Sequence, residues 1–301
     1  MNNKSQNGLI LERQAIEFSR EEVEKINESD PKIEKRLDKV SPFEITYCSD
    51  GFNVKGYLIV PGSGGSYPCL IYNRGGSRSF GAISREKVGT FLTRVASWGY
   101  VVVASQYRGN CGGEGKEEYG GEDVKDMLNL FPLLESIQEA DTDRIGAYGR
   151  SRGGMMTYIL LRQTSHLAAA IVDAGVSNMF SLAKDRPELE EVWQELIPNY
   201  HSEKRVALKE RSALFWPEEL DKETPILILH GSGDWRSPLP QGLEMARSLY
   251  DCRHPFRSVF FEGGDHQLNE HRAEVFRIIK SWLNRYVRDL EKWPSLEPHG
   301  E

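Results

Sequence analysis

The sequence predicts an α/β fold with a mostly parallel sheet, an antiparallel N-terminal edge and helices on both faces. Two observations carry this prediction. Short apolar strands alternate with longer segments of helical periodicity along most of the 301 residues, which is typical of right-handed crossovers between parallel strands. Near the start, two apolar runs flank Ser49-Asp50-Gly51, a hairpin signal that predicts the antiparallel edge.

The first 42 residues are highly charged and contain few core-forming side chains. We expect a helical arm here, because Ser19 and Glu22 have the spacing of a capping box; a solvated tail is the alternative. Residues 43–301 are expected to form a single α/β domain.

The remaining elements follow from apolar runs and periodicity. The expected strands are two within 43–61, then 68–73, 100–105, 144–149, 168–175, 225–231 and 256–263. The expected helices are 84–99, 122–137 with an irregularity at Pro132, 153–162, 238–251 and 275–290.

One segment, at about 175–222, interrupts this alternation and shows no strand pattern. A structureless loop of that length is uncommon, so we expect a helical cap insertion above the strand ends. Its aromatic residues either line a compact apolar pocket or pack the insertion against the sheet. These residues are Phe180, Trp193, Phe215 and Trp216.

Composition excludes several classes of protein. The net charge is −7 and the pI is about 5.7, which argues against nucleic-acid binding. No apolar run is long enough to span a membrane, and the N-terminus lacks the apolar core of a signal peptide, so we expect a cytoplasmic protein. The four cysteines are far apart in sequence, and neither a metal site nor any cofactor is expected.

The segment Ala147–Met155 (AYGRSRGGM) is the strongest chemical signal in the chain. Ser151 directly follows a predicted strand and opens a predicted helix, which is the context of a nucleophile on a sharp turn. Gly149 and Gly153 match the lack of space two residues to either side of such a serine. The alternative is an ordinary helix-capping serine.

A nucleophilic serine needs a base and an acid that orients the base. In this type of fold the acid follows a later strand and the histidine follows the last one. Asp234 and His266 occupy those positions. Asp173 is a rival acid that we expect to be structural, and His230 is expected to order the Asp234 loop by a local hydrogen bond.

Four motifs in this order resemble the prolyl oligopeptidase family of serine hydrolases, within the α/β-hydrolase superfamily. They are Gln106–Gly113 (QYRGNCGG), Gly149–Gly154 (GRSRGG), His230–Asp234 (HGSGD) and Gly263–His266 (GGDH). The resemblance covers about residues 43–290. It implies an α/β-hydrolase fold whose catalytic triad is Ser151, Asp234 and His266.

The sequence departs from the family pattern in two ways. Only 42 residues precede the first expected strand, so we expect a member without the β-propeller that filters peptides in family peptidases. Arg74 stands where some members have an oxyanion-hole tyrosine, so the hole is expected from the backbone N–H groups of Arg152 and of Gly76 or Gly75.

Three residues are candidates for substrate contacts. Arg74 is either a clamp for a substrate carboxylate or an exposed or ion-paired arginine, and Tyr107 and Arg108 belong to the loop that resembles the family's tyrosine–arginine–glycine loop.

These residues predict a serine hydrolase that cleaves carboxylic esters of small substrates through an acyl-enzyme. A peptidase or amidase acting on short peptides is the alternative, and an inactive hydrolase fold used for binding is a third hypothesis. Transfer of the acyl group to an alcohol or amine would use the same residues. The sequence leaves the oligomeric state open and allows a homo-oligomer.

Overall fold

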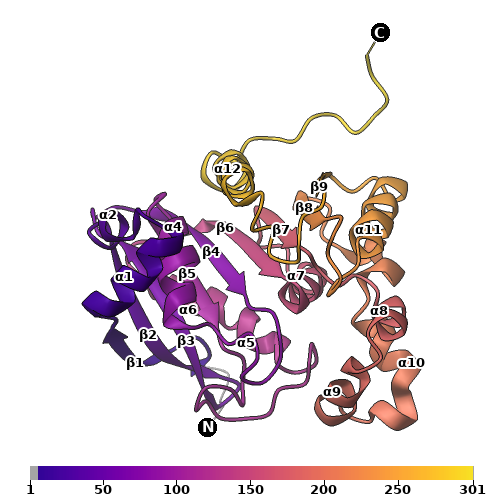
Figure 1. Cartoon of the computed structure of the whole chain (residues 1–301), viewed down its shortest axis with the longest axis horizontal. Coiled ribbons are helices and arrows are strands. Elements are labelled where there is room, and N and C mark those ends of the chain that lie inside the picture. The colour runs from indigo at the N-terminus through magenta and orange to yellow at the C-terminus, as the bar shows by residue number, and fades with distance from the viewer. Residues whose placement is uncertain (1–5, 301) are drawn as a thin grey trace. The chain divides into compact units, whose positions relative to one another are not determined.

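The computed structural model of the protein describes residues 6–300, and the chain divides into two compact units (Figure 1). Unit 1 comprises residues up to 117 together with 122–145. Unit 2 comprises the short segment 118–121 and the residues from 146 onward.

In unit 1, the strands are neighbours in the order β1-β2-β3-β5-β4. Antiparallel pairing joins β1 to β2, β2 to β3 and β3 to β5, whereas β4 and β5 are parallel. The antiparallel N-terminal edge is therefore confirmed. The bounds are Ile10–Ala15 for β1, Val40–Ser49 for β2, Phe52–Pro61 for β3, Tyr67–Asn73 for β4 and Val101–Ser105 for β5.

The turn between β2 and β3 follows from its two central residues. Asp50 has φ 52° and Gly51 has φ 85°, and two consecutive positive φ values are what a two-residue hairpin turn of the favoured type requires. Ser49 and Phe52 then pair directly across the hairpin, as the Ser49-Asp50-Gly51 signal predicts.

The helices of unit 1 cover its strands. Helices α4 and α6 both contact β5. The segment from 85 to 96 is one continuous helix with a π-turn in its middle, and the helix break at Asn129 precedes Pro132, which cannot donate a helical hydrogen bond. The bounds are Arg20–Ser29 (α1), Ile33–Leu37 (α2), Arg85–Lys87 (α3), Val88–Leu92 (η2), Thr93–Ala96 (α4), Val124–Leu128 (α5) and Leu130–Glu135 (α6).

The first 42 residues do not form a separate arm. The expected helix is present as α1, and Ser19 and Glu22 form both of the reciprocal hydrogen bonds of the capping box. However, strand β1 precedes that helix and pairs with β2, so this segment belongs to the same unit as the strands that follow. The sequence predicts a domain boundary after residue 42. The structure instead places the residues on both sides of that position in unit 1, because β1 pairs with β2.

A buried ion pair anchors the N-terminal helices. Asp30 accepts from Nη1 of Arg36 at 2.8 Å and also pairs with Arg94, and the side chains of Asp30 and Arg36 are 4% and 8% exposed. Although burial opposes it, the two guanidinium groups hold the pKa of Asp30 below its ordinary value. Close packing holds the same helices together: a Cβ at Gly89 would lie only 2.7 Å from Cδ1 of Ile26, so α1 packs against the backbone of the 85–96 helix.

In unit 2, all strand pairs are parallel. β6 begins in unit 1 and ends in unit 2, and β6 pairs with β7, β7 with β8, and β8 with β9. Strands β7 and β8 are fully buried, which explains their unbroken apolar runs. The bounds are Ala140–Arg150 (β6), Ala169–Asp173 (β7), Ile226–Gly231 (β8) and Phe256–Phe261 (β9).

The segment between β7 and β8 is helical, and α8, α9 and α10 lie together apart from these strands (Figure 1). Within the described residues, no helix is long and apolar enough to cross a membrane. The helices of unit 2 are Arg152–Gln163 (α7), Met179–Asp185 (α8), Leu189–Leu196 (α9), Tyr200–Glu210 (α10), Ala213–Phe215 (η3), Pro217–Glu219 (η4), Pro240–Asp251 (α11), Arg272–Leu283 (α12) and Asn284–Arg288 (η5).

Two histidines of unit 2 are buried near the ends of strands. His230 and His254 are 0% and 1% exposed, and the Nε2 atom of each faces a backbone carbonyl, of Ser237 at 2.7 Å and of Thr224 at 3.0 Å. Burial lowers the pKa of both imidazoles, so both are neutral in the folded protein near pH 7.

The ion pair of Asp30 gives a first prediction. Asp30→Ala removes the carboxylate and leaves the guanidinium of Arg36 buried without it, which should lower the free energy of unfolding by about 3–5 kcal/mol. Urea unfolding measures the loss. The matched control is Glu24→Gln, because the Arg20–Glu24 pair is 93% and 65% exposed and its removal should change little. Equal effects of the two substitutions would contradict the buried pair's role.

The two buried histidines give a second prediction. Because their folded-state pKa values are lowered, the unfolded chain binds protons more readily, and stability is lost as the pH falls below about 6.5. The slope should reach up to about 1.4 kcal/mol per pH unit for each histidine. Urea unfolding between pH 7.5 and 5.5 measures it. The double variant His230→Gln/His254→Gln should show a shallower slope; an unchanged slope would refute the assignment.

Candidate active site

Ser151 occupies a strained turn between β6 and α7. Its backbone has φ 60° and ψ −126°, a combination that costs free energy for a residue with a Cβ. Gly149 is required nearby, because a Cβ there would lie 2.0 Å from the carbonyl oxygen of Gly153. The strand–turn–helix context expected for Ser151 is thus present, and it differs from that of a capping serine, since no side-chain cap bond forms.

Backbone hydrogen bonds hold this conformation in place. The N–H of Ser151 donates to the carbonyl of Asp173 at 2.9 Å, and the carbonyl of Ser151 accepts from Gly154 at 2.9 Å and Val176 at 3.3 Å. Helix α7 begins at Arg152, so its N-terminal N–H groups and their partial positive charge lie beside the serine. Such a position favours negative charge on a reacting group.

Asp234 and His266 are brought together by the loops that follow β8 and β9. Nδ1 of His266 lies 2.8 Å from Oδ2 of Asp234, and the two side chains are 13% and 0% exposed. A carboxylate only accepts, so the bond assigns the proton of the imidazole to Nδ1. Nε2 is thereby left as the acceptor that a general base requires.

The loop of Asp234 supplies the other partners of its carboxylate. Oδ1 accepts from the backbone N–H groups of Arg236 at 2.9 Å and Ser237 at 3.0 Å. These bonds close a turn directly after β8 and fix the direction of Oδ2. The buried carboxylate is therefore oriented by its own loop before any substrate is present.

The rival residues have structural partners. Asp173 accepts from Nη2 of Arg150 at 2.6 Å and from the hydroxyl of Tyr148 at 2.5 Å. Asp265 accepts from the backbone N–H groups of Gln267 and Asn269 within its own turn. These contacts agree with the structural role expected of Asp173.

The structure contradicts the expectation that Arg74 contacts substrate. Its side chain is fully buried, and its guanidinium donates to the carbonyls of Gln106 at 3.0 Å and Arg78 at 3.0 Å. It is neither a carboxylate clamp nor an exposed or ion-paired arginine. Tyr107 is also buried and its hydroxyl donates to the carbonyl of Arg74 at 3.1 Å, so its phenol is committed to the same loop.

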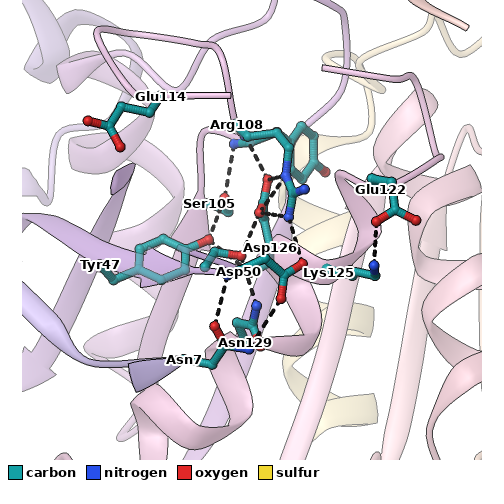
Figure 2. A network of polar contacts seen from close by, with 12 residues as sticks. Asn7, Tyr47, Asp50, Ser105, Arg108, Glu114, Glu122, Lys125, Asp126 and Asn129 are labelled. Carbon is teal, nitrogen blue, oxygen red and sulfur yellow. Dashed lines mark hydrogen bonds and ion pairs between the residues drawn. The ribbon is translucent and has the colours of Figure 1, made fainter. Parts of the chain in front are cut away.

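The guanidinium of Arg108, a second expected substrate contact, is likewise engaged by partners within unit 1. Figure 2 shows it within a network of polar contacts, in which Nη2 lies 2.8 Å from Oδ1 of Asp126 and 3.3 Å from Oδ2 of Asp50. Although burial opposes it, the two carboxylates raise the pKa of Arg108. The hydroxyl of Tyr47 joins the network through Ser105 at 2.8 Å. Arg108 therefore holds the loop after β5 in place, with its guanidinium paired to Asp126 and Asp50 rather than free for a substrate.

Gly75 and Gly76 form a tight turn in unit 1. Gly76 has φ 67° and a Cβ there would lie 2.2 Å from the carbonyl oxygen of Phe80. The turn explains why the sequence has glycine at this point. The participation of Gly75, Gly76 and Arg152 in an oxyanion hole stays a prediction.

Sequence reasoning missed a cluster around Tyr119. The guanidinium carbon of Arg152 lies 4.4 Å from the centroid of the Tyr119 ring, and that ring makes an edge contact with Trp193 at 6.1 Å between centroids. Arg211 donates to the carbonyls of Tyr119 at 2.9 Å and Glu118 at 3.1 Å. The short segment 118–121 thus ties the helical insertion to the residue that follows Ser151.

The aromatic residues of the insertion serve mainly in packing. Trp193 and Trp216 are 0% and 3% exposed, and Nε1 of Trp216 donates to the carbonyl of Lys209 at 3.0 Å. Phe180 and Phe215 make an edge contact at 5.4 Å, and Phe215 remains 45% exposed. The sequence predicts that these residues either line a pocket or pack the insertion in place. Burial shows that both tryptophans serve in packing.

Comparison with known proteins agrees with the fold and the motifs. The family model for the prolyl oligopeptidase family matches residues 89–289. An uncharacterised peptidase of Bacillus subtilis, YtmA, is 30% identical over 247 residues, which cover 80% of this chain and 92% of YtmA. Dipeptidyl-peptidase 5 of Porphyromonas gingivalis is 27% identical over 278 residues, which cover 84% of this chain and 39% of that protein.

A solved structure gives the same result for the fold. The acylaminoacyl peptidase of Pyrococcus horikoshii superposes with a TM-score of 0.74 at 24% identity, over 89% of this chain and 45% of that one. The chain thus spans most of YtmA but less than half of dipeptidyl-peptidase 5 and of the acylaminoacyl peptidase. The family match over more than half of its length and the likeness to YtmA establish that this chain is a serine hydrolase of the prolyl oligopeptidase family, with an α/β-hydrolase fold.

Proposed function

We propose that this chain is a serine peptidase that hydrolyses amide bonds of short peptides, with Ser151, His266 and Asp234 as its catalytic triad. The observation that carries the proposal is the 2.8 Å contact between His266 Nδ1 and Asp234 Oδ2, in the same unit as the strained turn of Ser151. A nucleophile, a base and an oriented acid in this chain order are the parts that acyl transfer requires.

The proposed reaction proceeds in two halves. Oγ of Ser151 attacks the substrate carbonyl, its proton passes to Nε2 of His266, and the tetrahedral intermediate collapses as that proton moves to the leaving amine. Water then attacks the acyl-enzyme with His266 again acting as base, which releases the acid and restores Ser151. Asp234 holds the imidazole in its Nδ1–H form and stabilises its charged state. The N–H of Arg152 is proposed to stabilise the oxyanion.

Peptides are favoured over esters as substrates because of the relatives. YtmA is described as a peptidase, and more distant relatives include dipeptidyl-peptidase 5 and acylamino-acid-releasing enzymes. The expectation from sequence placed small esters first and peptides second. The relatives support the second reading better. The aromatic pocket that would have suited small esters also loses both of its tryptophans to packing.

The triad gives a third prediction. Ser151→Ala should abolish labelling by a fluorophosphonate probe and lower turnover by roughly 10⁴–10⁶-fold. Asp234→Asn should lower turnover by about 10⁴-fold, because the imidazole loses the acceptor that fixes its tautomer. The rates are measured per labelled or folded molecule.

The control for the acid is Asp173→Asn. That carboxylate pairs with Arg150, so its loss should lower the melting temperature yet leave the rate of the folded molecules within about tenfold of wild type. A large rate loss in Asp173→Asn together with a mild one in Asp234→Asn would show that the acid is misassigned.

The substrate class gives a fourth prediction. Pentapeptides with free and with acetylated amino termini should be cleaved at an amide bond with kcat/KM of about 10⁴ M⁻¹ s⁻¹ or more, the lower end of ordinary enzymes. Mass spectrometry identifies the bond, and Ser151→Ala is the control. Turnover of nitrophenyl butyrate without cleavage of any peptide would restore the ester hypothesis.

A further inference from the structure

The carboxylate of Asp234 lies between two imidazoles. Oδ2 is 2.8 Å from Nδ1 of His266 and 3.5 Å from Nε2 of His230. The first histidine is the proposed base. The second lies at the end of β8, four residues before Asp234, and its side chain is 0% exposed. The mechanism proposed above gives it no part.

The surroundings of His230 fix its protonation. Nε2 lies 2.7 Å from the carbonyl oxygen of Ser237, which only accepts, so the proton is on Nε2. Nδ1 is buried without a hydrogen-bond partner and faces α11, where a Cβ on Gly242 would lie 2.8 Å from it. A second proton on Nδ1 would have no acceptor, and burial accordingly lowers the pKa of His230.

A small closed circuit of contacts results. The N–H of His230 points to the carbonyl of Ser237, the N–H of Ser237 donates to Oδ1 of Asp234 at 3.0 Å, and Oδ2 of Asp234 lies near the His230 N–H. At 3.5 Å the last contact is electrostatic rather than a good hydrogen bond. Together the three contacts fix the plane of the Asp234 carboxylate. They also place the positive end of the His230 N–H dipole beside Oδ2, the oxygen that accepts from His266.

We infer that His230 is a positioning residue for the proposed triad: it holds the Asp234 loop and moderates the negative potential that Oδ2 exerts on His266. This inference rests on the proposed function. The titratable groups that face His230 are Asp234 from its own loop, His266 from the loop after β9 and Asp173 from the end of β7. From α11 it faces the uncharged Gly242, and on β9 its strand partner is the uncharged Phe260.

The inference has a measurable consequence for pH dependence. Without the N–H dipole, the carboxylate attracts a protonated His266 more strongly, so the base is lost at a higher pH. The half-maximal pH on the acidic side of the rate profile should therefore rise. A residue that served only packing would lower stability but would leave this pH unchanged.

The chain offers a matched control in His254. It is equally buried, its Nε2 faces a backbone carbonyl, its Nδ1 is buried without a hydrogen-bond partner, and burial lowers its pKa as well. It differs from His230 in its charged neighbours, which are Asp221 and Lys222 instead of Asp234. His254→Leu should thus reproduce the packing loss of His230→Leu without the effect on the triad.

The test measures the second-order rate constant of fluorophosphonate labelling of Ser151 from pH 5 to 9 in the full chain. His230→Leu should label about tenfold more slowly at pH 8 and shift the acidic half-maximum upward by about 0.4 unit, which corresponds to about 0.5 kcal/mol. His254→Leu should keep the wild-type profile. His230→Gln should recover most of the rate and of the profile, because its Nε2 is as many bonds from Cβ as that of histidine and carries an N–H.

The outcomes separate the inference from the function beneath it. Labelling that depends on Ser151 and Asp234, combined with one common acidic half-maximum for His230→Leu, His254→Leu and wild type, would overturn the inference alone. Labelling that persists in Ser151→Ala would overturn the proposed function and the inference together. If His230→Leu fails to fold, the comparison of His230→Gln with wild type decides. A His230→Gln variant that labels tenfold more slowly, with no shift of the acidic half-maximum, would also overturn the inference.

Discussion

Parallel pairing of β6, β7, β8 and β9 is the constraint on which the candidate site depends. Parallel neighbours in register end at the same edge of a sheet, so the loops that follow them are delivered to one place. Ser151 follows β6, Asp173 ends β7, Asp234 follows β8 and His266 follows β9. The contacts among these loops then need only short turns. The turn of Ser151 is held by backbone bonds to Asp173 and Val176, and the turn of Asp234 is closed by its own carboxylate.

The turn at Ser151 costs conformational free energy, and hydrogen bonds from neighbouring residues stabilise it. The conformation of Ser151 is disfavoured for any residue with a Cβ, yet it is fixed by bonds to Asp173, Gly154 and Val176. These partners come from the end of β7, from the first turn of α7 and from the loop that follows β7. Preorganisation of this kind means that little free energy is needed to arrange the groups at the moment of reaction.

The sequence reveals the features that depend on local rules. Strands β7 and β8 appear as apolar runs because they are buried on both faces, and the turn at Ser151 is visible because its sterics require glycine at fixed offsets. Asp234 and His266 follow from chain order once the strands are known. The capping box at Ser19 is equally local and is present as expected.

The features that the sequence hides depend on distant partners. Arg74 and Arg108 have residue types typical of substrate binding, but burial is not visible in their motifs, and carbonyls and carboxylates from elsewhere in unit 1 use their donors. Strand β1 is invisible because it lies at the sheet edge with five exposed residues of six, so it shows no alternation. Tyr119 gives no signal beyond the Gly-Gly pair that follows it.

His230 illustrates how one residue can be both structural and functional. Its buried N–H must find an acceptor, since an unsatisfied polar group inside a protein costs free energy. The acceptor it finds is the carbonyl of the loop that carries Asp234, so satisfying the imidazole and orienting the acid are one event. The neutral form of His230 is required for both, and the packing of Gly242 against Nδ1 enforces that form. The geometry of the proposed acid is thereby linked to the core of the fold and not only to its surface loops.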